Sequence, residues 1–292
     1  MALADSGASL ESLGLSAVEV RALVETALAE DRGQGDLTTR LTVTEGTRAR
    51  GTFFSKQRLV VAGLPVAALV FEALDASCAW KTHIHDGAEV EAGTALAETS
   101  GLAAPLLAGE RVALNFLQHL SGIATLAWRL KQQLEGLHVQ LLDTRKTLPG
   151  LRSLEKYAVR MGGGRNHRLR LDDGILIKNN HLRLAGGIRA ALERARRHRP
   201  QGFQIEVEIT SLEELEEAIR SGADVVLLDN MSPDLVRQCV TRAAGRAKLE
   251  VSGGVDAGNI HAYGETGVDY ISVGALTHSA PAADINFRLE PV

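Results

Sequence analysis

The pattern of apolar and polar positions changes partway along the chain, and each half predicts a different kind of sheet. Ser16 is placed to cap a helix that runs to about Glu30, because apolar residues follow it at helical spacing. From about Arg48 to Gly101, short alternating segments are separated by glycine turns, and a helix over residues 65–74 interrupts them. Period-two alternation is typical of strands with one buried face, so this half predicts a small α+β domain around an antiparallel sheet.

A helical pattern over residues 109–134 leads into a second half with a different rhythm. Short, almost continuously apolar segments alternate there with helical stretches such as SLEELEEAIRSG. Strands of this kind are buried on both faces, and their alternation with helices is typical of βα units in a parallel sheet. The six predicted strands are VQLLD, GILIK, FQIEVEI, DVVLLD, KLEVSG and DYISVG.

Together these patterns predict an incomplete TIM-type α/β barrel with an N-terminal α+β sandwich domain. We expect residues 1–112 to form the first domain, joined by the C-terminal tail 280–292, and residues 113–279 to form the barrel. An open doubly wound sheet is the alternative arrangement of the same βα units. The small polar residues 1–15 and the stretch DRGQGDLTT are expected to lie outside regular structure.

Bulk composition narrows the class of protein. Apolar residues make up 45% and charged residues 23% of the 292 residues, as in ordinary globular proteins. The formal net charge of -4 argues against a generally basic, nucleic-acid-binding surface. Cys78 and Cys239 are far apart and predict neither a disulfide framework nor a zinc site. The N-terminus lacks the features of a secretory signal, and the uncharged run over residues 59–71 is too short to span a bilayer, so we expect a cytoplasmic protein without a membrane partner.

Positive charge is concentrated in one segment. Residues 143–178 hold nine Lys or Arg against four Asp or Glu, and the surplus continues to Arg199. Most of the cations in this segment are arginines. Apolar residues and a Gly-Gly-Gly turn lie among them, unlike in a flexible lysine-rich tail. Such a local cluster suits a pocket that receives a small, heavily anionic molecule.

Polar and glycine residues stand where the predicted strands end. Because the carboxyl ends of parallel strands meet at one face of a barrel, the loops there build the active site. We therefore expect these side chains and turns to converge on one mouth. The residues concerned are Thr144, Arg145, Lys146, Lys178, Glu206, Glu208, Asp229, Ser252, Gly253, Gly254 and Gly274.

These residues also have purely structural interpretations. The strand-end cations could be solvated loop charges, and Asp229 could cap the next helix, although Ser232 is better placed to do so. Glu206 and Glu208 are two residues apart, so both point to one side of their strand. Two carboxylates inside a barrel are costly unless they meet cations or a metal, and we expect at least Glu208, nearer the mouth, to be functional.

Glycine turns close the last two predicted strands. They let backbone N–H groups approach a phosphate, and barrels often bind one between their final strands. The triple glycine at 162–164 lacks the GK[ST] of a phosphate loop, and we expect it to bring Asn166, His167 and Arg168 over the barrel mouth. His167 is either a structural histidine or an anion contact with a proton-linked role.

Eight stretches, spread in order from Glu30 to Pro281, carry a resemblance to a known family. They are EDRGQGDLTT, GERVALNFLQHLSGIAT, DTRKTLPGLRSLEKYAV, GGGRNHRLRLDDGILIKNNH, IEVEITSLEEL, VVLLDNMSP, EVSGGV and YISVGALTHSAP. The DTRKT and NHR…IKNNH blocks are specific. Through these stretches the chain resembles the nicotinate-nucleotide pyrophosphorylases, also called quinolinate phosphoribosyltransferases.

The resemblance implies phosphoribosyl transfer from phosphoribosyl pyrophosphate to quinolinate with decarboxylation, giving nicotinate mononucleotide, pyrophosphate and CO2 in NAD biosynthesis. It implies Mg²⁺ as cofactor, held by Glu208 and Asp229 and partly through the substrate. It also implies a homodimer or higher assembly in which Arg111 reaches the site of the neighbouring subunit. The implied catalytic residues are Lys146, Lys178, Glu208 and Asp229. The implied substrate-binding residues are Arg111, Thr144, Arg145, Lys146, His167, Arg168, Lys178, Glu208, Asp229, Ser252, Gly253, Gly254, Val273, Gly274 and Ala275.

Within that set, the resemblance divides the substrates among different residues. It places the pyridine dicarboxylate against Arg145, His167, Arg168 and Lys178, with Lys146 on the pyrophosphate side. The glycine turns then hold the ribose 5-phosphate. The remaining cations of the basic segment, Arg152, Lys156 and Arg160, fall at helical spacing and are expected to add background field or subunit contacts.

Three other functions stay open at this point. A barrel lyase could use Lys178 as a Schiff base, although this leaves the arginine cluster unexplained. A non-catalytic relative could sense polyanions, although a binder has no need of Glu208 and Asp229. A paralogue within the family could act on another aromatic acid.

Overall fold

The computed structural model of the chain describes residues 10–292. The irregular structure predicted for residues 1–15 therefore lies largely outside the described part, and inside it Glu11–Leu13 forms a turn of 3₁₀ helix. No helix within residues 10–292 is both long and apolar enough to cross a bilayer.

By internal contacts the chain divides into two compact units. The first takes the described residues up to Trp128 together with 148–163 and 280–292, and the second takes 129–147 and 164–279. This division differs from the boundary we predicted, because the first unit includes most of the long helix over residues 103–132 and also residues 148–163. The tail 280–292 falls in the first unit.

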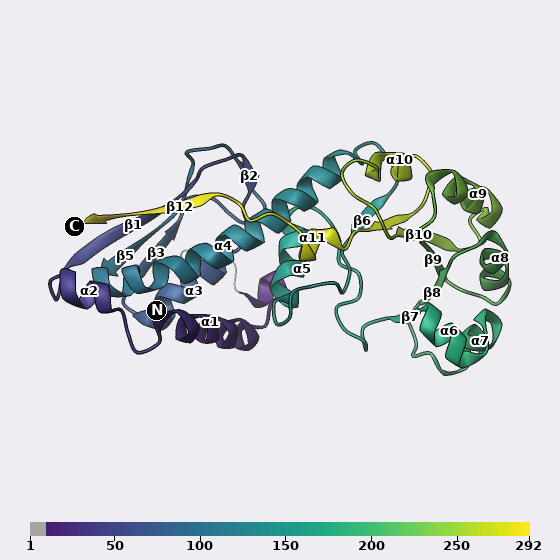
Figure 1. The fold of residues 1–292 in the computed structure, drawn as a ribbon, viewed down its shortest axis with the longest axis horizontal. Helices are drawn as coiled ribbons and strands as arrows, with labels where there is room; N and C mark the ends of the chain where they lie inside the picture. Colours follow the sequence, from purple (N-terminus) through teal and green to yellow (C-terminus); the bar gives the residue numbers. More distant parts are fainter. Residues whose placement is uncertain (1–9) are drawn as a thin grey trace. The chain divides into compact units, whose positions relative to one another are not determined.

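The elements of the first unit are β1 (Arg48–Ser55), β2 (Leu59–Val60), β3 (Ala79–Thr82), β4 (Glu89–Val90), β5 (Ala95–Leu102), β12 (Ile285–Pro291), α1 (Ala17–Arg32), α2 (Leu37–Thr42), α3 (Leu64–Leu74), most of α4 (Ala103–Gln132), and α5 (Arg152–Met161). Four strands form an antiparallel sheet in the order β12-β1-β5-β3 (Figure 1). A separate two-stranded sheet pairs β2 with β4. Alternate residues of β1 are buried, as its period-two pattern predicts. The predicted N-terminal α+β domain is confirmed.

An aromatic cluster forms the core of this unit. The Phe53 ring lies 4.5 Å from that of Phe287 and 5.8 Å from that of Trp80, measured between centroids. Gly51 makes room for the cluster, because a Cβ there would stand 1.9 Å from Phe287 Cζ. Burial of such rings contributes much of the stability in a domain with few aromatic residues.

Capping side chains set the beginnings of the helices. Ser16 accepts the N–H of Glu19, as the sequence predicts. The loop predicted over DRGQGDLTT is partly wrong, since α2 begins inside it. Asp36 accepts the N–H of Thr39 at 2.9 Å and caps that helix.

The elements of the second unit are β6 (Gln140–Leu142), β7 (Ile175–Ile177), β8 (Ile205–Ile209), β9 (Val225–Asp229), β10 (Lys248–Ser252), β11 (Tyr270–Ser272), α6 (Asn179–Ala185), α7 (Ile188–His198), α8 (Leu212–Arg220), α9 (Pro233–Ala243), α10 (Ile260–Gly264) and α11 (Ala275–His278). The strands form one parallel sheet in the order β6-β11-β10-β9-β8-β7, with helices along it (Figure 1). Each predicted strand is present. Ser232 caps α9, which leaves the Asp229 carboxylate unneeded for that purpose.

The sheet is a barrel left open between β6 and β7. These two strands lie at opposite ends of the hydrogen-bonded order, although they are neighbours in sequence. After α5 the chain returns to lie alongside β6 at Arg165. There Arg165 N–H donates to Leu141 O at 2.8 Å, and Asp143 N–H donates to Arg165 O at 3.1 Å. It then runs on to β7, so residues 165–174 connect the two edges. The predicted incomplete barrel is confirmed.

Candidate functional site

The structure brings the strand-end residues of the second unit to one end of its sheet. Asp229 is paired with Ser252 across β9 and β10, and Ser272 with Leu142 across β11 and β6. Residues at and just after these positions therefore share the carboxyl end of the sheet. They are Thr144, Arg145 and Lys146 after β6, Lys178 after β7, Glu208 on β8, Asp229 on β9, Ser252, Gly253 and Gly254 at β10, and Val273, Gly274 and Ala275 after β11.

Lys146 lies against the turn that follows β11. Thr277 Oγ1 donates to the carbonyl of Lys146 at 2.7 Å, and Lys146 N–H donates to Thr144 Oγ1 at 3.0 Å. A Cβ on Gly274 would stand 2.9 Å from Lys146 Cδ, so glycine lets the lysine stem pass this close. The arrangement places an exposed ammonium beside a glycine turn, a combination suited to phosphate oxygens.

Asn230 ties the turn after β10 to the carboxylate of Asp229. Its amide donates to Asp229 Oδ1 at 3.0 Å, and its backbone N–H donates to Ser252 O at 2.9 Å. Asn230 has a φ of 54°, which asparagine tolerates better than most residues. Gly253 has a φ of 91°, and a Cβ on it would stand 2.4 Å from Asn230 Oδ1. The sequence analysis overlooked Asn230; the signal was an asparagine directly after a strand-end aspartate.

Glu208 and Asp229 occupy neighbouring strands and are only partly buried. Glu208 Oε2 lies 4.0 Å from Lys178 Nζ, and Glu208 Oε1 accepts the N–H of Asn179 at 3.5 Å. Both carboxylates keep lone pairs that these few donors do not use. Mg²⁺ takes one or two carboxylates and completes its shell with water and substrate oxygens, so this donor set fits that ion.

Arg145 and Arg168 are held near each other although their charges repel. The Nε of each is buried, with no hydrogen-bond partner among the described residues. Burial lowers the pKa of Arg168, the charge of Arg145 lowers it further, and Glu206 raises it. Arg168 Nη1 donates to Gly174 O at 3.0 Å. Two guanidinium groups with unused buried donors suit a ligand that carries two carboxylates.

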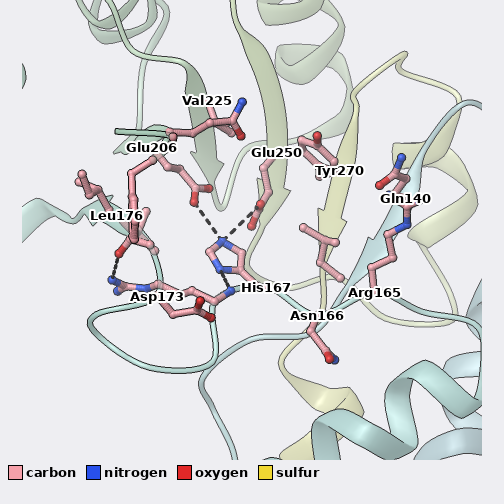
Figure 2. A pocket seen from close by; sticks show the side chains of 17 residues that line it. Gln140, Arg165, Asn166, His167, Asp173, Leu176, Glu206, Val225, Glu250 and Tyr270 are labelled. Atoms are coloured by element: carbon pink, nitrogen blue, oxygen red, sulfur yellow. Dashed lines mark hydrogen bonds and ion pairs between the residues drawn. The ribbon is translucent and has the colours of Figure 1, made fainter. Parts of the chain in front are cut away.

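Asp143 anchors the segment that carries His167. This fully buried carboxylate accepts the N–H of His167 at 2.9 Å and an amide hydrogen of Asn166. The triple glycine was predicted to bring these residues over the barrel mouth. Instead Asn166 turns to Asp143 and the His167 ring enters the interior of the strand layer (Figure 2). Asp143 was missed as a site residue, although it ends a strand as Asp229 does.

The His167 ring lies between two carboxyl groups. Its Nε2 is 3.0 Å from Glu206 Oε2 and 3.6 Å from Glu250 Oε2 (Figure 2). Burial first, and then the charge of Glu206, raise the pKa of Glu250 to about 8, while His167 lowers it. Glu250 was missed by the sequence analysis. Its signal was a carboxylate two residues before Ser252, on the same side of an otherwise apolar strand.

A cavity of about 460 Å³ opens beside this cluster, away from most of the strand-end residues. Gln140, Val225 and Tyr270, which begin β6, β9 and β11, line it together with His167 and Arg168 (Figure 2). The glycine turns, both lysines, Glu208 and Asp229 are not among its lining residues. Active sites of parallel barrels form at the other end of the strands, and of the predicted substrate-binding residues only His167 and Arg168 line this cavity.

The remaining cations predicted from the sequence lie in the first unit. Arg111 is exposed on α4. Lys156 on α5 is only 1% exposed, and its predicted background field or subunit contact stays a prediction. The guanidinium of Arg160 packs over the Tyr157 ring and donates to Leu13 O, which is a structural role.

Comparison with known proteins gives a family for both parts of the chain. The profile described as "Quinolinate phosphoribosyl transferase, N-terminal domain" matches residues 36–121. The profile of the C-terminal domain of the same family matches residues 123–288.

Individual relatives agree with these matches along most of the chain. A Bacillus subtilis protein described as a probable nicotinate-nucleotide pyrophosphorylase (carboxylating) is 42% identical over 269 residues, which cover 92% of this chain and 93% of that protein. A Nicotiana glauca protein described as a mitochondrial quinolinate phosphoribosyltransferase (decarboxylating) is 35% identical over 292 residues, covering 93% and 82%. The crystal structure of NadC from Streptococcus pyogenes has a TM-score of 0.91 and 39% identity, covering 95% of this chain and 99% of that one.

Proposed function

The chain belongs to the quinolinate phosphoribosyl transferase family, and from this premise we propose that it transfers phosphoribosyl from phosphoribosyl pyrophosphate to quinolinate. The products are nicotinate mononucleotide, pyrophosphate and CO2, a step of NAD biosynthesis. One observation supports this most strongly. Arg145 and Arg168 lie near each other, and the buried Nε–H of each donates to no described residue. Quinolinate carries two carboxylates on adjacent ring carbons, which two guanidinium groups can hold.

Quinolinate binds with its carboxylates toward Arg145 and Arg168. Planar guanidinium forks match carboxylate geometry better than ammonium groups do. Lys178 adds a half-exposed positive charge at the same end of the sheet. His167 belongs to this part of the site, and Thr144 supports the backbone of Lys146 there.

Phosphoribosyl pyrophosphate binds across the later strands. The 5-phosphate lies at Ser252, Gly253 and Gly254 and at the turn of Val273, Gly274 and Ala275, and Lys146 faces the pyrophosphate. Glu208 and Asp229 would hold Mg²⁺ together with substrate oxygens, and the ion would offset negative charge on the pyrophosphate.

Catalysis rests on positioning and electrostatic stabilisation, with no covalent intermediate on the protein. The bond from ribose C1 to pyrophosphate breaks as the quinolinate nitrogen forms its bond to C1, and Lys146 and Lys178 stabilise the charge that develops. The ring nitrogen is then positively charged, so the carbon beside it can retain the electron pair when its carboxylate leaves as CO2. A proton replaces the carboxylate, and the site need only hold the ring and exclude water.

The complete site includes Arg111 of a second copy of the chain. Its exposed position on α4 is available for such a contact, and a homodimer or higher assembly follows. We place this activity in the cytoplasm. Mixing an Arg111→Ala protein with a protein that carries an inactive barrel tests the assembly, because hybrid dimers regain one complete site.

Lys178 supports the transferase over a Schiff-base lyase. A Schiff-base lysine attacks as the neutral amine and is usually desolvated in an apolar pocket. Lys178 is half exposed and lies 4.0 Å from a carboxylate, so it is not in a desolvated, apolar pocket. Borohydride with a carbonyl substrate should therefore trap no adduct at Lys178.

A direct assay tests the function. The purified protein is incubated with quinolinate, phosphoribosyl pyrophosphate and Mg²⁺, and nicotinate mononucleotide is measured by mass spectrometry. We expect product with quinolinate and none with nicotinate, because the reaction includes loss of a carboxylate. Equal turnover of another aromatic acid would identify a paralogue, and ligand binding without pyrophosphate release would identify a sensor.

A further inference from the structure

One buried hydroxyl group links the loop after β6 to the segment after β11. Thr277 on α11 is 1% exposed, and its Oγ1 lies 2.7 Å from the carbonyl oxygen of Lys146 and 3.2 Å from that of Gly274. A hydroxyl group has a single hydrogen, and the Lys146 oxygen lies at the ordinary distance for it. Thr277 therefore donates its hydrogen bond to the backbone of Lys146.

The loop that carries Lys146 lies beyond the hydrogen bonds of the sheet. Where β6 ends, Val273 N–H donates to Leu142 O at 3.0 Å, and residues 143–151 lie outside the helices and strands. A loop of this kind takes its position from the groups that bond its backbone. For Lys146 these are two threonine hydroxyls, since Thr144 Oγ1 accepts its N–H at 3.0 Å and Thr277 donates to its carbonyl.

The side chain of Lys146 lies against the same short segment as its backbone. A Cβ on Gly274 would stand 2.9 Å from Lys146 Cδ, so the lysine stem passes directly over this glycine. Thr277 follows three residues later and holds the Lys146 carbonyl. Lys146 is nevertheless exposed, so its side chain is accessible to a ligand at this turn. Residues 274–277 thus fix both the backbone and the stem of Lys146.

We propose that Thr277 is a positioning residue, which fixes Lys146 beside the turn of residues 273–275 and so sets where its ammonium group meets the substrate. This inference rests on the proposed function, in which that turn holds the 5-phosphate and Lys146 faces the pyrophosphate. Because Thr277 is buried, it acts through Lys146 and not by contact with the substrate. A displacement of about 1 Å near a reacting group can lower the rate about a hundredfold, so one backbone hydrogen bond at this point has a measurable effect.

Three substitutions separate this role from a purely structural one. Thr277→Val keeps the branched side chain but removes the hydroxyl group, and Thr277→Ser keeps the hydroxyl group. The matched control is Thr266→Val, because Thr266 is also buried and its Oγ1 donates to the Tyr263 carbonyl at 2.6 Å. Thr266 precedes the start of β11, so it lies at the opposite end of the sheet from Lys146. For each protein we would measure kcat, the KM of both substrates and the melting temperature.

We expect Thr277→Val to lower kcat about tenfold, because Lys146 loses its fixed place at the turn. Thr277→Ser should keep kcat within about twofold of the wild type, because serine can donate the same hydrogen bond. Thr266→Val should also keep kcat within about twofold, although its melting temperature should fall about as much as that of Thr277→Val.

A double-mutant cycle with Lys146→Ala shows whether Thr277 acts through Lys146. Once the ammonium group is absent, Thr277→Val should change the remaining kcat by less than about twofold. Slow turnover is followed by mass spectrometry of the accumulated nicotinate mononucleotide. The dissociation constant of pyrophosphate in the presence of Mg²⁺ gives the same comparison without turnover.

Three results would overturn the inference: equal losses of kcat in Thr277→Val and Thr266→Val, no rescue by Thr277→Ser, or an undiminished effect of Thr277→Val in the Lys146→Ala protein. If Thr277→Val does not fold, Thr277→Ala removes the same hydroxyl group and replaces it in the cycle. Failure of both proteins to fold would show that Thr277 is structural and would also overturn the inference. A wild-type protein without activity would refute the proposed function, whereas an active wild type with an unaffected Thr277→Val protein would refute the inference alone.

Discussion

Two pairs of carboxyl groups lie at different depths in the sheet of the second unit, and they share only strand β8. The deep pair is Glu206 and Glu250, which face His167 and are almost fully buried. The mouth pair is Glu208 and Asp229, which are partly exposed and contact Lys178 and Asn230. Glu206 and Glu208 are only two residues apart on β8, a distance of about 7 Å along a strand.

That small step changes the chemistry of a carboxylate. At the deep pair, burial first and then the charge of Glu206 raise the pKa of Glu250 to about 8, so this carboxyl group keeps its proton at neutral pH. At the mouth pair, both carboxyl groups are partly exposed and lie beside Lys178 and Asn230, as the proposed Mg²⁺ site requires. Residue type alone therefore does not assign a role to a glutamate; its depth in the barrel does.

The largest effect is expected at the mouth pair. Glu208→Gln should lower kcat about 10²- to 10³-fold, because it removes charge where the reaction develops it. The melting temperature should stay within a few degrees, since a partly exposed residue contributes little to stability. Steady-state kinetics over a range of Mg²⁺ concentrations measure this. Glu265→Gln, at an exposed glutamate of the same unit, is the control. Normal turnover in Glu208→Gln would place the metal carboxylates elsewhere.

A second large effect is expected from substitution of Arg145. Arg145→Ala should raise the KM for quinolinate about 100-fold, because hydrogen bonds between charged groups contribute about 1.5–3 kcal/mol each. Arg183→Ala on α6, which is exposed, serves as the control. Equilibrium binding of quinolinate provides an independent measurement. Near-normal affinity in Arg145→Ala would refute its assignment to the dicarboxylate.

A moderate effect on stability separates the deep pair from the mouth pair. The folded protein holds a proton on Glu250 up to a pKa of about 8, whereas the unfolded chain releases it near the ordinary value of 4.5. The groups that face Glu250 are Glu206, His167 and Ser272. The free energy of unfolding should therefore fall as pH rises between these two values, by at most about 1.4 kcal/mol per pH unit.

Glu250→Gln removes this dependence, because glutamine does not titrate. Urea unfolding at several pH values measures the free energy of unfolding of both proteins. We expect the variant to gain stability relative to the wild type as pH rises from 5 to 8. Parallel pH profiles for the two proteins would show that Glu250 is ionised in the folded state.

The smallest effect is expected in the cavity at the opposite end of the strands. Gln140→Ala changes a residue that lines this cavity at the start of β6 and is not one of the strand-end residues. Both kcat and the two KM values should stay within about twofold of the wild type, as for ordinary surface substitutions. A selective rise in the quinolinate KM would move the substrate site into this cavity.

Much of the fold and the mouth of the site could be predicted from sequence. The apolar runs predicted each strand of the parallel sheet, and the residues at their ends predicted Glu208, Asp229 and the glycine turns. These features depend on local period and on the rule that strand ends converge, so a single sequence carries them.

The deep pair could not be predicted in the same way. Glu250 partners Glu206 only because β8 and β10 face a common interior, and His167 arrives from a loop without periodicity. The burial of Lys156 could not be predicted for a similar reason, since helical spacing does not tell which side of α5 is covered. Asn230 and Asp143 stand at strand ends, but only the structure shows that Asn230 donates to Asp229 and that Asp143 accepts the N–H of His167.

One measurement tests the central claim most directly. Quinolinate labelled with ¹³C in the carboxylate next to the ring nitrogen is incubated with phosphoribosyl pyrophosphate, Mg²⁺ and the wild-type protein. The account predicts labelled CO2, pyrophosphate and unlabelled nicotinate mononucleotide in equal amounts, and almost none of them with Glu208→Gln. Product that retains the label, or turnover that is equal in the two proteins, would contradict it.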